Sequence, residues 1–265
     1  MVPDMIKLIA SDLDGTLLQD SPQVSQEMLE LIPQMKASGI LFAAASGRQY
    51  YSLKNLFSPV WEDMLFICEN GALIMQGDQE LSADQIPREW GLALIEQILS
   101  HEDCEVLLSG KRQCYIAPRD EAYRRHITGY VKNKTTIIQH FTSVQENFIK
   151  ISLYRSKGVT PQLLAEFTDR WGSQMTVAAA DSCWIDFTLS NKGTSLKKIS
   201  GILDIRPEEM MAFGDNFNDR EMLAYVGVAY AMENAHPDLK KLAGSTCARV
   251  EPVIREVLQG RRQLL

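Results

Sequence analysis

Apolar and polar positions follow two different patterns along the N-terminal third of the chain. Residues 6–10, 40–45 and 64–68 are mainly apolar runs, which is typical of strands covered on both faces. Between the first two runs, apolar residues recur at helical spacing over 24–35, and Gly39 is a typical helix end. This order predicts a βαβαβ unit and hence a parallel sheet with helices on both faces.

The alternation of strand and helix signals breaks off after residue 83 and resumes after Lys192. In the middle segment we expect antiparallel pairing, with helices over 90–99, 121–131 and 160–171 and strands over 105–108, 113–117, 148–154, 175–179 and 184–188. After Lys192, strands over 210–213 and 226–230 alternate with predicted helices over 194–203, 220–224, 237–242 and 253–258. The middle segment is therefore expected to be an α+β insertion.

The expected architecture is an α/β fold with a Rossmann-like, doubly wound parallel sheet and an inserted α+β domain. We place the sheet domain at residues 1–82 and 188–265, and the inserted domain at 83–187. The pair Asn70-Gly71, which follows the third apolar run, predicts a tight turn into a hairpin.

The composition is that of a globular protein without a membrane span. The 265-residue chain is 45% hydrophobic, and no apolar stretch reaches the roughly 18 residues that a spanning helix needs. Five scattered cysteines without C-x-x-C spacing, and an N-terminus without a secretory layout, favour a reducing cytoplasm. The net charge of −7 argues against a nucleic-acid partner, although a local cationic pocket can still bind a small anion.

Two aspartates one residue apart, Asp12 and Asp14, end the first predicted strand. Aspartate is disfavoured inside strands, and two carboxylates about 5 Å apart repel by roughly 3 kcal/mol at an effective dielectric near 20. Polar residues stand at corresponding strand ends or helix starts elsewhere: Ser46-Gly47-Arg48, Lys192 before Gly193, and Asp215-x-x-Asn218-Asp219. Ligands bind at this edge of open α/β sheets. Converging carboxylates predict a hard divalent ion, and Mg²⁺ prefers such oxygen ligands.

Each candidate residue also has an ordinary structural interpretation. The aspartates, the serine and the asparagines could be helix caps or turn residues. Lys192 could be an ordinary surface lysine, and Arg48 could be a solvated charge or pair with a core carboxylate. The occurrence of four motifs in step with the predicted strands favours the functional interpretation.

The motifs DLDGT (12–16), SGR (46–48), NKG (191–193) and GDNFND (214–219) stand in the order and spacing of the haloacid dehalogenase superfamily. The long insert, together with ENGALI at 69–74, resembles the Cof-type branch of sugar-phosphatase-like hydrolases with a C2-type cap. The resemblance implies a Mg²⁺-dependent phosphatase that hydrolyses small phosphorylated metabolites, such as sugar phosphates or similar monoesters, through an aspartyl-phosphate.

The resemblance also implies a role for each motif residue. Asp12 is implied as the nucleophile and Asp14 as the general acid and then base. The implied Mg²⁺ ligands are the Asp12 and Asp215 side chains and the Asp14 backbone carbonyl. Ser46 and Lys192 are implied to stabilise the phosphoryl group.

A further set of residues is implied around this centre. Asp219 is implied to orient Lys192 or a metal-bound water. The implied substrate-binding residues are Ser46, Gly47, Arg48, Asn70, Gly71, Lys192 and Asn218.

Two alternatives stay open at this stage. A phosphomutase would use the same two aspartates, and a catalytically idle regulator would bind a phosphorylated metabolite in the same pocket. The aspartate at position 14 separates the chain from dehalogenases and transport ATPases of the superfamily. The stretch LSNKG (189–193) departs from the Pro-Gly-rich turn of many relatives. No motif names the substrate or the oligomeric state.

Overall fold

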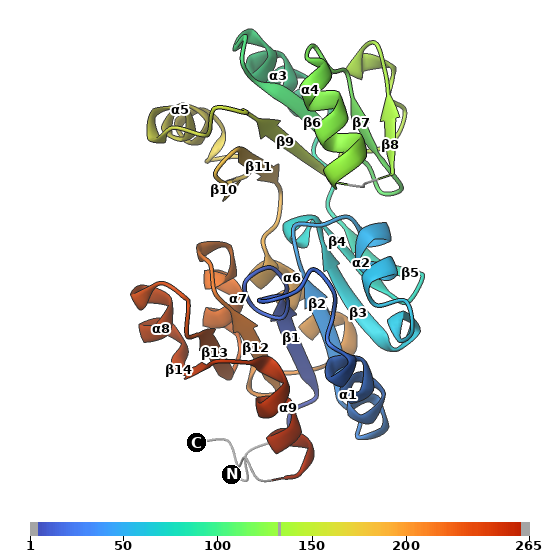
Figure 1. The fold of residues 1–265 in the computed structure, drawn as a ribbon, viewed down its shortest axis with the longest axis vertical. Helices are drawn as coiled ribbons and strands as arrows, with labels where there is room; N and C mark the ends of the chain where they lie inside the picture. The colour runs from blue at the N-terminus through green and yellow to red at the C-terminus, as the bar shows by residue number, and fades with distance from the viewer. Residues whose placement is uncertain (1–4, 132–133, 261–265) are drawn as a thin grey trace.

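In the computed structural model, which describes residues 5–131 and 134–260, the chain forms two units that meet end to end (Figure 1). We call them the main unit, built on an eight-stranded sheet, and the inserted unit, built on a six-stranded sheet. The chain enters the inserted unit after β5 and leaves it after β11.

The main sheet has the strand order β14-β13-β12-β1-β2-β3-β4-β5. Its strands from β14 to β3 pair in parallel, whereas β4 and β5 pair antiparallel. The bounds are β1 Leu8–Asp12, β2 Leu41–Ala45, β3 Met64–Cys68, β4 Leu73–Gln76, β5 Gln79–Ala83, β12 Met210–Gly214, β13 Val228–Met232 and β14 Gly244–Cys247. The predicted doubly wound, mostly parallel sheet is thus confirmed, and so is the hairpin from β3 to β4.

Helices cover both faces of the main sheet. One face packs against α1 (Gln26–Ala37), α2 (Tyr50–Leu56) and α9 (Val250–Leu258). The other packs against α6 (Lys192–Leu203), α7 (Arg220–Tyr225) and α8 (Pro237–Ala243). Short helical turns complete the unit: η1 Trp61–Asp63, η2 Glu69–Gly71, η5 Pro207–Glu209 and η6 Phe217–Asp219.

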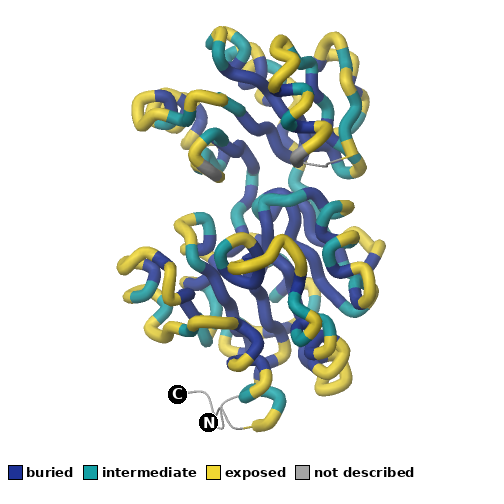
Figure 2. Tube along the Cα trace, in the orientation of Figure 1, coloured by how far each residue is buried: buried dark blue, intermediate teal, exposed yellow. Residues whose placement is uncertain are grey.

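The apolar runs of the sequence have a direct explanation in this packing. Along β1, Leu8 and Ala10 belong to the apolar cluster on one face, and Ile9 belongs to the cluster on the other. Both faces are therefore buried, as the dark central strands in Figure 2 show. A strand buried on both faces needs a continuous apolar run rather than alternation.

The inserted unit has the strand order β10-β11-β9-β6-β7-β8. The strands are β6 Glu105–Ser109, β7 Cys114–Ile116, β8 Thr135–Ile137, β9 Lys150–Tyr154, β10 Thr176–Asp181 and β11 Trp184–Thr188. Helices α3 (Arg88–Ser100) and α5 (Pro161–Trp171) pack on one face. On the other face lie α4 (Glu121–Arg125) and the π-helical η3 (His126–Val131), and η4 (Phe141–Ser143) connects β8 to β9.

Two sequence predictions about the strands were wrong. The inserted sheet is not wholly antiparallel, because β7 pairs with β8 in parallel. Strands β5, β8 and β14 were also missed, since each is a short segment without a continuous apolar run.

Candidate active site

Three neighbouring strands of the main sheet end at the site. β1 lies between β12 and β2 and pairs in parallel with both. Asp12 is the last residue of β1, Ser46 directly follows β2, and Asp215 directly follows β12. Because parallel strands end on the same edge of a sheet, these distant residues come together there. Lys192, the first residue of α6, joins them from a helix.

Lys192 is a buried cation between two buried carboxylates. Its Nζ donates to Asp12 Oδ1 at 2.5 Å and to Asp219 Oδ1 at 2.6 Å. The side chains of Lys192 and Asp219 are 0% exposed and that of Asp12 is 9% exposed. Asn191 caps the helix, since its Oδ1 accepts from the Thr194 N–H at 2.8 Å. The cap fixes where α6 begins and so where Lys192 enters the site.

The charges of this cluster shift one another's pKa values. Burial, and the neighbouring Asp219 and Asp215, raise the pKa of Asp12 to about 8 against the opposing effect of Lys192. Burial alone would lower the pKa of Lys192, but Asp12 and Asp219 raise it above its usual range. Burial likewise raises the pKa of Asp215. Three carboxylates around one lysine favour the binding of a further cation.

Asp219 is fully engaged by neighbouring donors. Its Oδ1 accepts from Lys192, and its Oδ2 accepts from the N–H groups of Asp215 and Asn216 at 3.1 Å each. Gly214 leaves room for it, because a Cβ there would lie 2.5 Å from the Asp219 Cβ. Asp219 therefore orients both the lysine and the start of the segment that carries Asp215.

Asp215 is held from the other side by the turn that follows β1. The Thr16 hydroxyl donates to Asp215 Oδ1 at 2.8 Å. Gly15 has φ +88°, and a Cβ at this position would overlap the Asp215 carboxylate. A residue with a Cβ would be strained at this left-handed φ and would also clash with the Asp215 carboxylate, so the position favours glycine.

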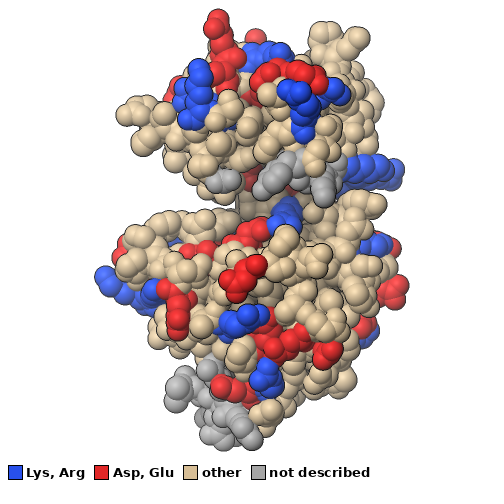
Figure 3. Space-filling model, in the orientation of Figure 1, with Lys and Arg blue, Asp and Glu red and all other residues tan. Residues whose placement is uncertain are grey.

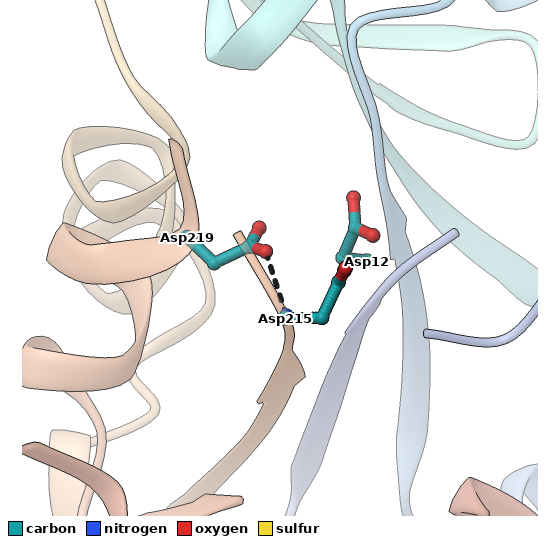
Figure 4. A group of neighbouring side chains, drawn as sticks. All are labelled: Asp12, Asp215 and Asp219. Atoms are coloured by element: carbon teal, nitrogen blue, oxygen red, sulfur yellow. Dashed lines mark hydrogen bonds between the residues drawn. The ribbon is translucent and has the colours of Figure 1, made fainter. Parts of the chain in front are cut away.

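The donor set fits Mg²⁺. One carboxylate oxygen each of Asp12, Asp215 and Asp219 lies within 4.8 Å of the others, and Figure 4 shows the three side chains converging from β1 and from the segment after β12. Hard oxygen donors suit this ion. Because both Asp219 oxygens already accept hydrogen bonds, Asp12 and Asp215 are the side chains that fit direct coordination.

Asp14 faces outward and pairs with Arg48. The guanidinium donates from Nε to Asp14 Oδ2 at 3.1 Å and from Nη2 to Oδ1 at 2.5 Å. The side chains are 61% exposed for Asp14 and 34% for Arg48. The sequence allowed a pair between Arg48 and a core carboxylate, but the partner is instead the exposed Asp14. The pair joins the DLDGT motif, which contains Asp14, to the SGR motif, which contains Arg48, at the exposed edge of the site.

Ser46 lies in a tightly held loop. Its side chain is buried, and its Oγ accepts from the Arg48 N–H at 3.3 Å. The Ser46 carbonyl accepts from the Asn70 N–H at 3.0 Å, and the Arg48 carbonyl accepts from the Glu69 N–H at 3.1 Å. The turn η2 thus supports the loop 46–48 from behind.

The remaining predicted residues occupy different surroundings. Asn70 Nδ2 donates to Asp186 Oδ2 of the inserted unit at 2.7 Å. Gly71 lies under α6, where its carbonyl accepts from Ser195 Oγ at 2.8 Å. Asn218 has a buried Oδ1 without a hydrogen-bond partner in the described part of the chain.

The family of the chain follows from comparison with known proteins. A family model described as haloacid dehalogenase-like hydrolase matches residues 9–251. The chain belongs to this family. The resemblance stated from the motifs is therefore confirmed.

This hydrolase is similar to curated phosphatases over nearly its whole length. It is 28% identical over 233 residues to the 5-amino-6-(5-phospho-D-ribitylamino)uracil phosphatase YbjI of Escherichia coli, covering 87% of the chain and 86% of the relative. It is 27% identical over 254 residues to the HMP-PP phosphatase of Serratia proteamaculans, covering 90% and 88%. A solved structure from Eubacterium rectale superposes with a TM-score of 0.85 at 27% identity, covering 96% and 99%. The expectation of an enzyme of the phosphatase class is confirmed.

Sequence reasoning missed several residues around this hydrolase's site. Lys150 and Asp186 of the inserted unit, and Glu69 of the main unit, lie behind the loop 46–48. The available signal was a single charged residue inside each of two apolar strands, 148–154 and 184–188. None of the described helices has the length and apolarity of a membrane-spanning segment.

Proposed function

We propose that the chain is a Mg²⁺-dependent phosphatase that hydrolyses small phosphorylated metabolites, such as sugar phosphates or similar monoesters, through an aspartyl-phosphate. The position of Asp12 carries the proposal. Its carboxylate ends a central strand, is held by Lys192 through one oxygen and lies beside Asp215. The names of the relatives, a phosphoribitylaminouracil phosphatase and an HMP-PP phosphatase, support small phosphorylated substrates.

The chemistry is divided between the two aspartates of the first motif. Lys192 holds Asp12 Oδ1, and we assign the attack on phosphorus to Oδ2. As the Asp12–phosphorus bond forms, the bond from phosphorus to the leaving oxygen breaks, and Asp14 donates a proton to that oxygen. Asp14 then takes a proton from the water that attacks the aspartyl-phosphate. Inorganic phosphate leaves and Asp12 is restored.

Charge on the transferring phosphoryl group needs compensation, because phosphoryl transfer depends mainly on alignment and electrostatics. In the proposal, the Ser46 hydroxyl and the Lys192 ammonium each contact a phosphoryl oxygen. Mg²⁺, when bound by the Asp12 and Asp215 carboxylates and the Asp14 backbone carbonyl, supplies further neutralisation. Asp219 acts through Lys192, which it orients.

Arg48 and Asp14 exchange partners when the substrate binds. An exposed ion pair contributes only about 0–1 kcal/mol, so a phosphorylated substrate can take the Arg48 guanidinium at small cost. Asp14 is then free to turn toward the leaving oxygen. Asn218 offers its unpartnered Oδ1 to the substrate. We assign to Gly47, Asn70 and Gly71 the shaping of the substrate side.

We also propose how the two units share the work. Residues 1–82 and 188–265 form the catalytic domain, and residues 83–187 form a cap that covers the site and contacts the leaving group. Space-filling atoms leave a narrow, charged gap between the two units on the face drawn in Figure 3. A cap that closes over such a gap excludes water during transfer.

Phosphate release from a panel of phosphorylated metabolites tests the proposal. With Mg²⁺ we expect turnover of at least one sugar phosphate or similar monoester, and chelation should abolish it. Asp12→Asn should lower kcat on the order of a thousandfold or more. Inactivity across sugar phosphates, nucleotides and cofactor phosphates, or full activity of Asp12→Asn, would contradict the proposal. A phosphorylated isomer as product would identify a mutase, and binding without turnover would identify a regulator.

A further inference from the structure

Lys150 belongs to the inserted unit, but its side chain ends at the substrate loop of the main unit. Its Nζ donates to the Gly47 carbonyl at 2.7 Å and pairs with Glu69 Oε2 at 2.7 Å and Asp186 Oδ2 at 3.3 Å. The side chain is 7% exposed. Three oxygen atoms thus lie within 3.3 Å of the Lys150 ammonium, one as a hydrogen-bond acceptor and two as ion-pair partners. Two of them come from the main unit and one from the inserted unit.

Three consecutive carbonyls of the loop 46–48 are held by donors. The Ser46 and Arg48 carbonyls accept from backbone N–H groups of the turn η2 in the main unit. The Gly47 carbonyl between them accepts from Lys150. Of these three hydrogen bonds, the one to the Gly47 carbonyl therefore depends on the position of the inserted unit.

The contact with Gly47 is transmitted to Ser46 through one rigid peptide. In a planar trans peptide, the Gly47 C=O and the Arg48 N–H point in opposite directions. The Arg48 N–H donates to Ser46 Oγ at 3.3 Å. Fixing the Gly47 carbonyl thus fixes the donor that orients the Ser46 hydroxyl.

The surroundings of Lys150 are strained and rich in charge. Glu69 and Asn70 have φ of 51° and 55°, values that residues with a Cβ rarely adopt unless their surroundings impose them. Glu69 and Asp186 are both buried carboxylates facing one ammonium. Asp186 also accepts from Asn70 Nδ2 at 2.7 Å and from Ser152 Oγ at 2.6 Å.

We propose that Lys150 is a positioning residue that couples the placement of the inserted unit to the geometry of the loop 46–48. When Lys150 is seated between Gly47, Glu69 and Asp186, the loop presents the Ser46 hydroxyl to the phosphoryl group. The catalytic consequence rests on the proposed phosphatase function, whereas the structural coupling does not.

Lys150→Met tests the coupling against a matched change. Lys111 also pairs across the two units, with Glu80 Oε1 at 2.7 Å, but both side chains are more exposed and neither contacts the loop. We expect Lys150→Met to lower kcat by about ten- to a hundredfold, because small misplacements near the reacting group have effects of this size. Lys111→Met should stay within about twofold of the wild type, since exposed pairs contribute little.

A double variant separates positioning from folding. Lys150→Met alone leaves two buried carboxylates without their cation and lowers the thermal midpoint. Adding Glu69→Gln returns the cluster to its original net charge of −1, counted over the side chains of Lys150, Glu69 and Asp186. We expect the double variant to recover most of the thermal midpoint but not kcat, because the Gly47 carbonyl still lacks its donor. Recovery of both would overturn the positioning role.

Amide hydrogen exchange supplies a readout that needs no activity. A peptide spanning residues 46–50 should exchange faster in Lys150→Met and in the double variant than in the wild type or Lys111→Met. Unchanged exchange in Lys150→Met would overturn the coupling even in an active enzyme. If the wild type hydrolyses nothing while exchange responds as expected, the proposed function fails and the coupling stands.

Discussion

Two buried lysines in this molecule each lie between two carboxylates, but their remaining partners differ. Lys192 pairs with Asp12 and Asp219 inside the main unit. Lys150 pairs with Glu69 and Asp186 and also donates to the Gly47 carbonyl across the two units. Around Lys150, the ammonium donates a hydrogen bond to the Gly47 carbonyl and forms ion pairs with both carboxylates. Around Lys192, Asp215 lies beside Asp12 as a third carboxylate, so three carboxylates share one lysine.

The difference separates a reactive cluster from a connecting one. Burial and two neighbouring carboxylates raise the pKa of Asp12, so this cluster favours the uptake of a cation or a proton. Burial also raises the pKa of Glu69, and the Lys150 ammonium opposes this shift. A cluster of three carboxylates around one lysine suits a bound metal and a phosphoryl group, whereas a lysine with partners from both units suits holding those units together.

The largest expected effect comes from removing the reactive lysine. Lys192→Met should lower kcat on the order of a thousandfold, the upper range for losing one donor to a developing charge. Lys197, on the exposed side of the same helix, provides the control, and Lys197→Met should leave kcat unchanged. Steady-state kinetics beside thermal melts measure both. If Lys150→Met impairs kcat as severely as Lys192→Met, the contrast between the two clusters is wrong.

A smaller effect is expected from narrowing the space around Asp215. Gly15→Ala adds a Cβ that overlaps this carboxylate, so the Mg²⁺ concentration for half-maximal activity should rise by about tenfold, or ~1.4 kcal/mol of lost binding. The backbone strain of a left-handed alanine costs roughly 1–2 kcal/mol in addition.

Gly39→Ala controls for that strain. Gly39 has φ +76°, close to the +88° of Gly15, but its Cβ would meet nothing within 4 Å. We expect a similar loss of stability and an unchanged Mg²⁺ requirement. Equal Mg²⁺ titrations for the two variants would show that Asp215 tolerates the added methyl group.

The same comparison shows what the sequence could predict. Asp12 and Asp215 stand in local motifs at strand ends, which sheet topology brings together, and Lys192 stands in a local motif at the start of a helix. The contacts of Lys150 and Asp186 depend on how two units meet, which no periodicity records. The bidentate Asp14–Arg48 pair depends on side-chain direction across a turn. Local motifs were therefore enough to predict the cluster around Lys192, whereas the cluster around Lys150 could be found only from the tertiary structure.

The smallest expected effect lies at the opposite edge of the same strands. Glu209 precedes β12, and its Oε1 pairs with Lys7, just before β1, at 2.6 Å, while its Oε2 accepts from the Arg206 N–H at 2.9 Å. The hydrogen bonds from Lys7 and the Arg206 backbone lower the pKa of Glu209 to about 2. This pair lies far from the strand ends that carry Asp12 and Asp215, so it should affect stability alone.

Glu209→Gln tests this assignment through pH. A carboxylate whose pKa is lower in the folded than in the unfolded chain adds stability above the unfolded pKa and loses it as the pH falls through the folded pKa. The variant should therefore melt below the wild type at pH 7, by no more than about 4 °C. The gap should narrow as the pH falls below 4.5 toward 2. Its kcat should match the wild type, and a loss of kcat would mean that the two edges of the sheet are not independent.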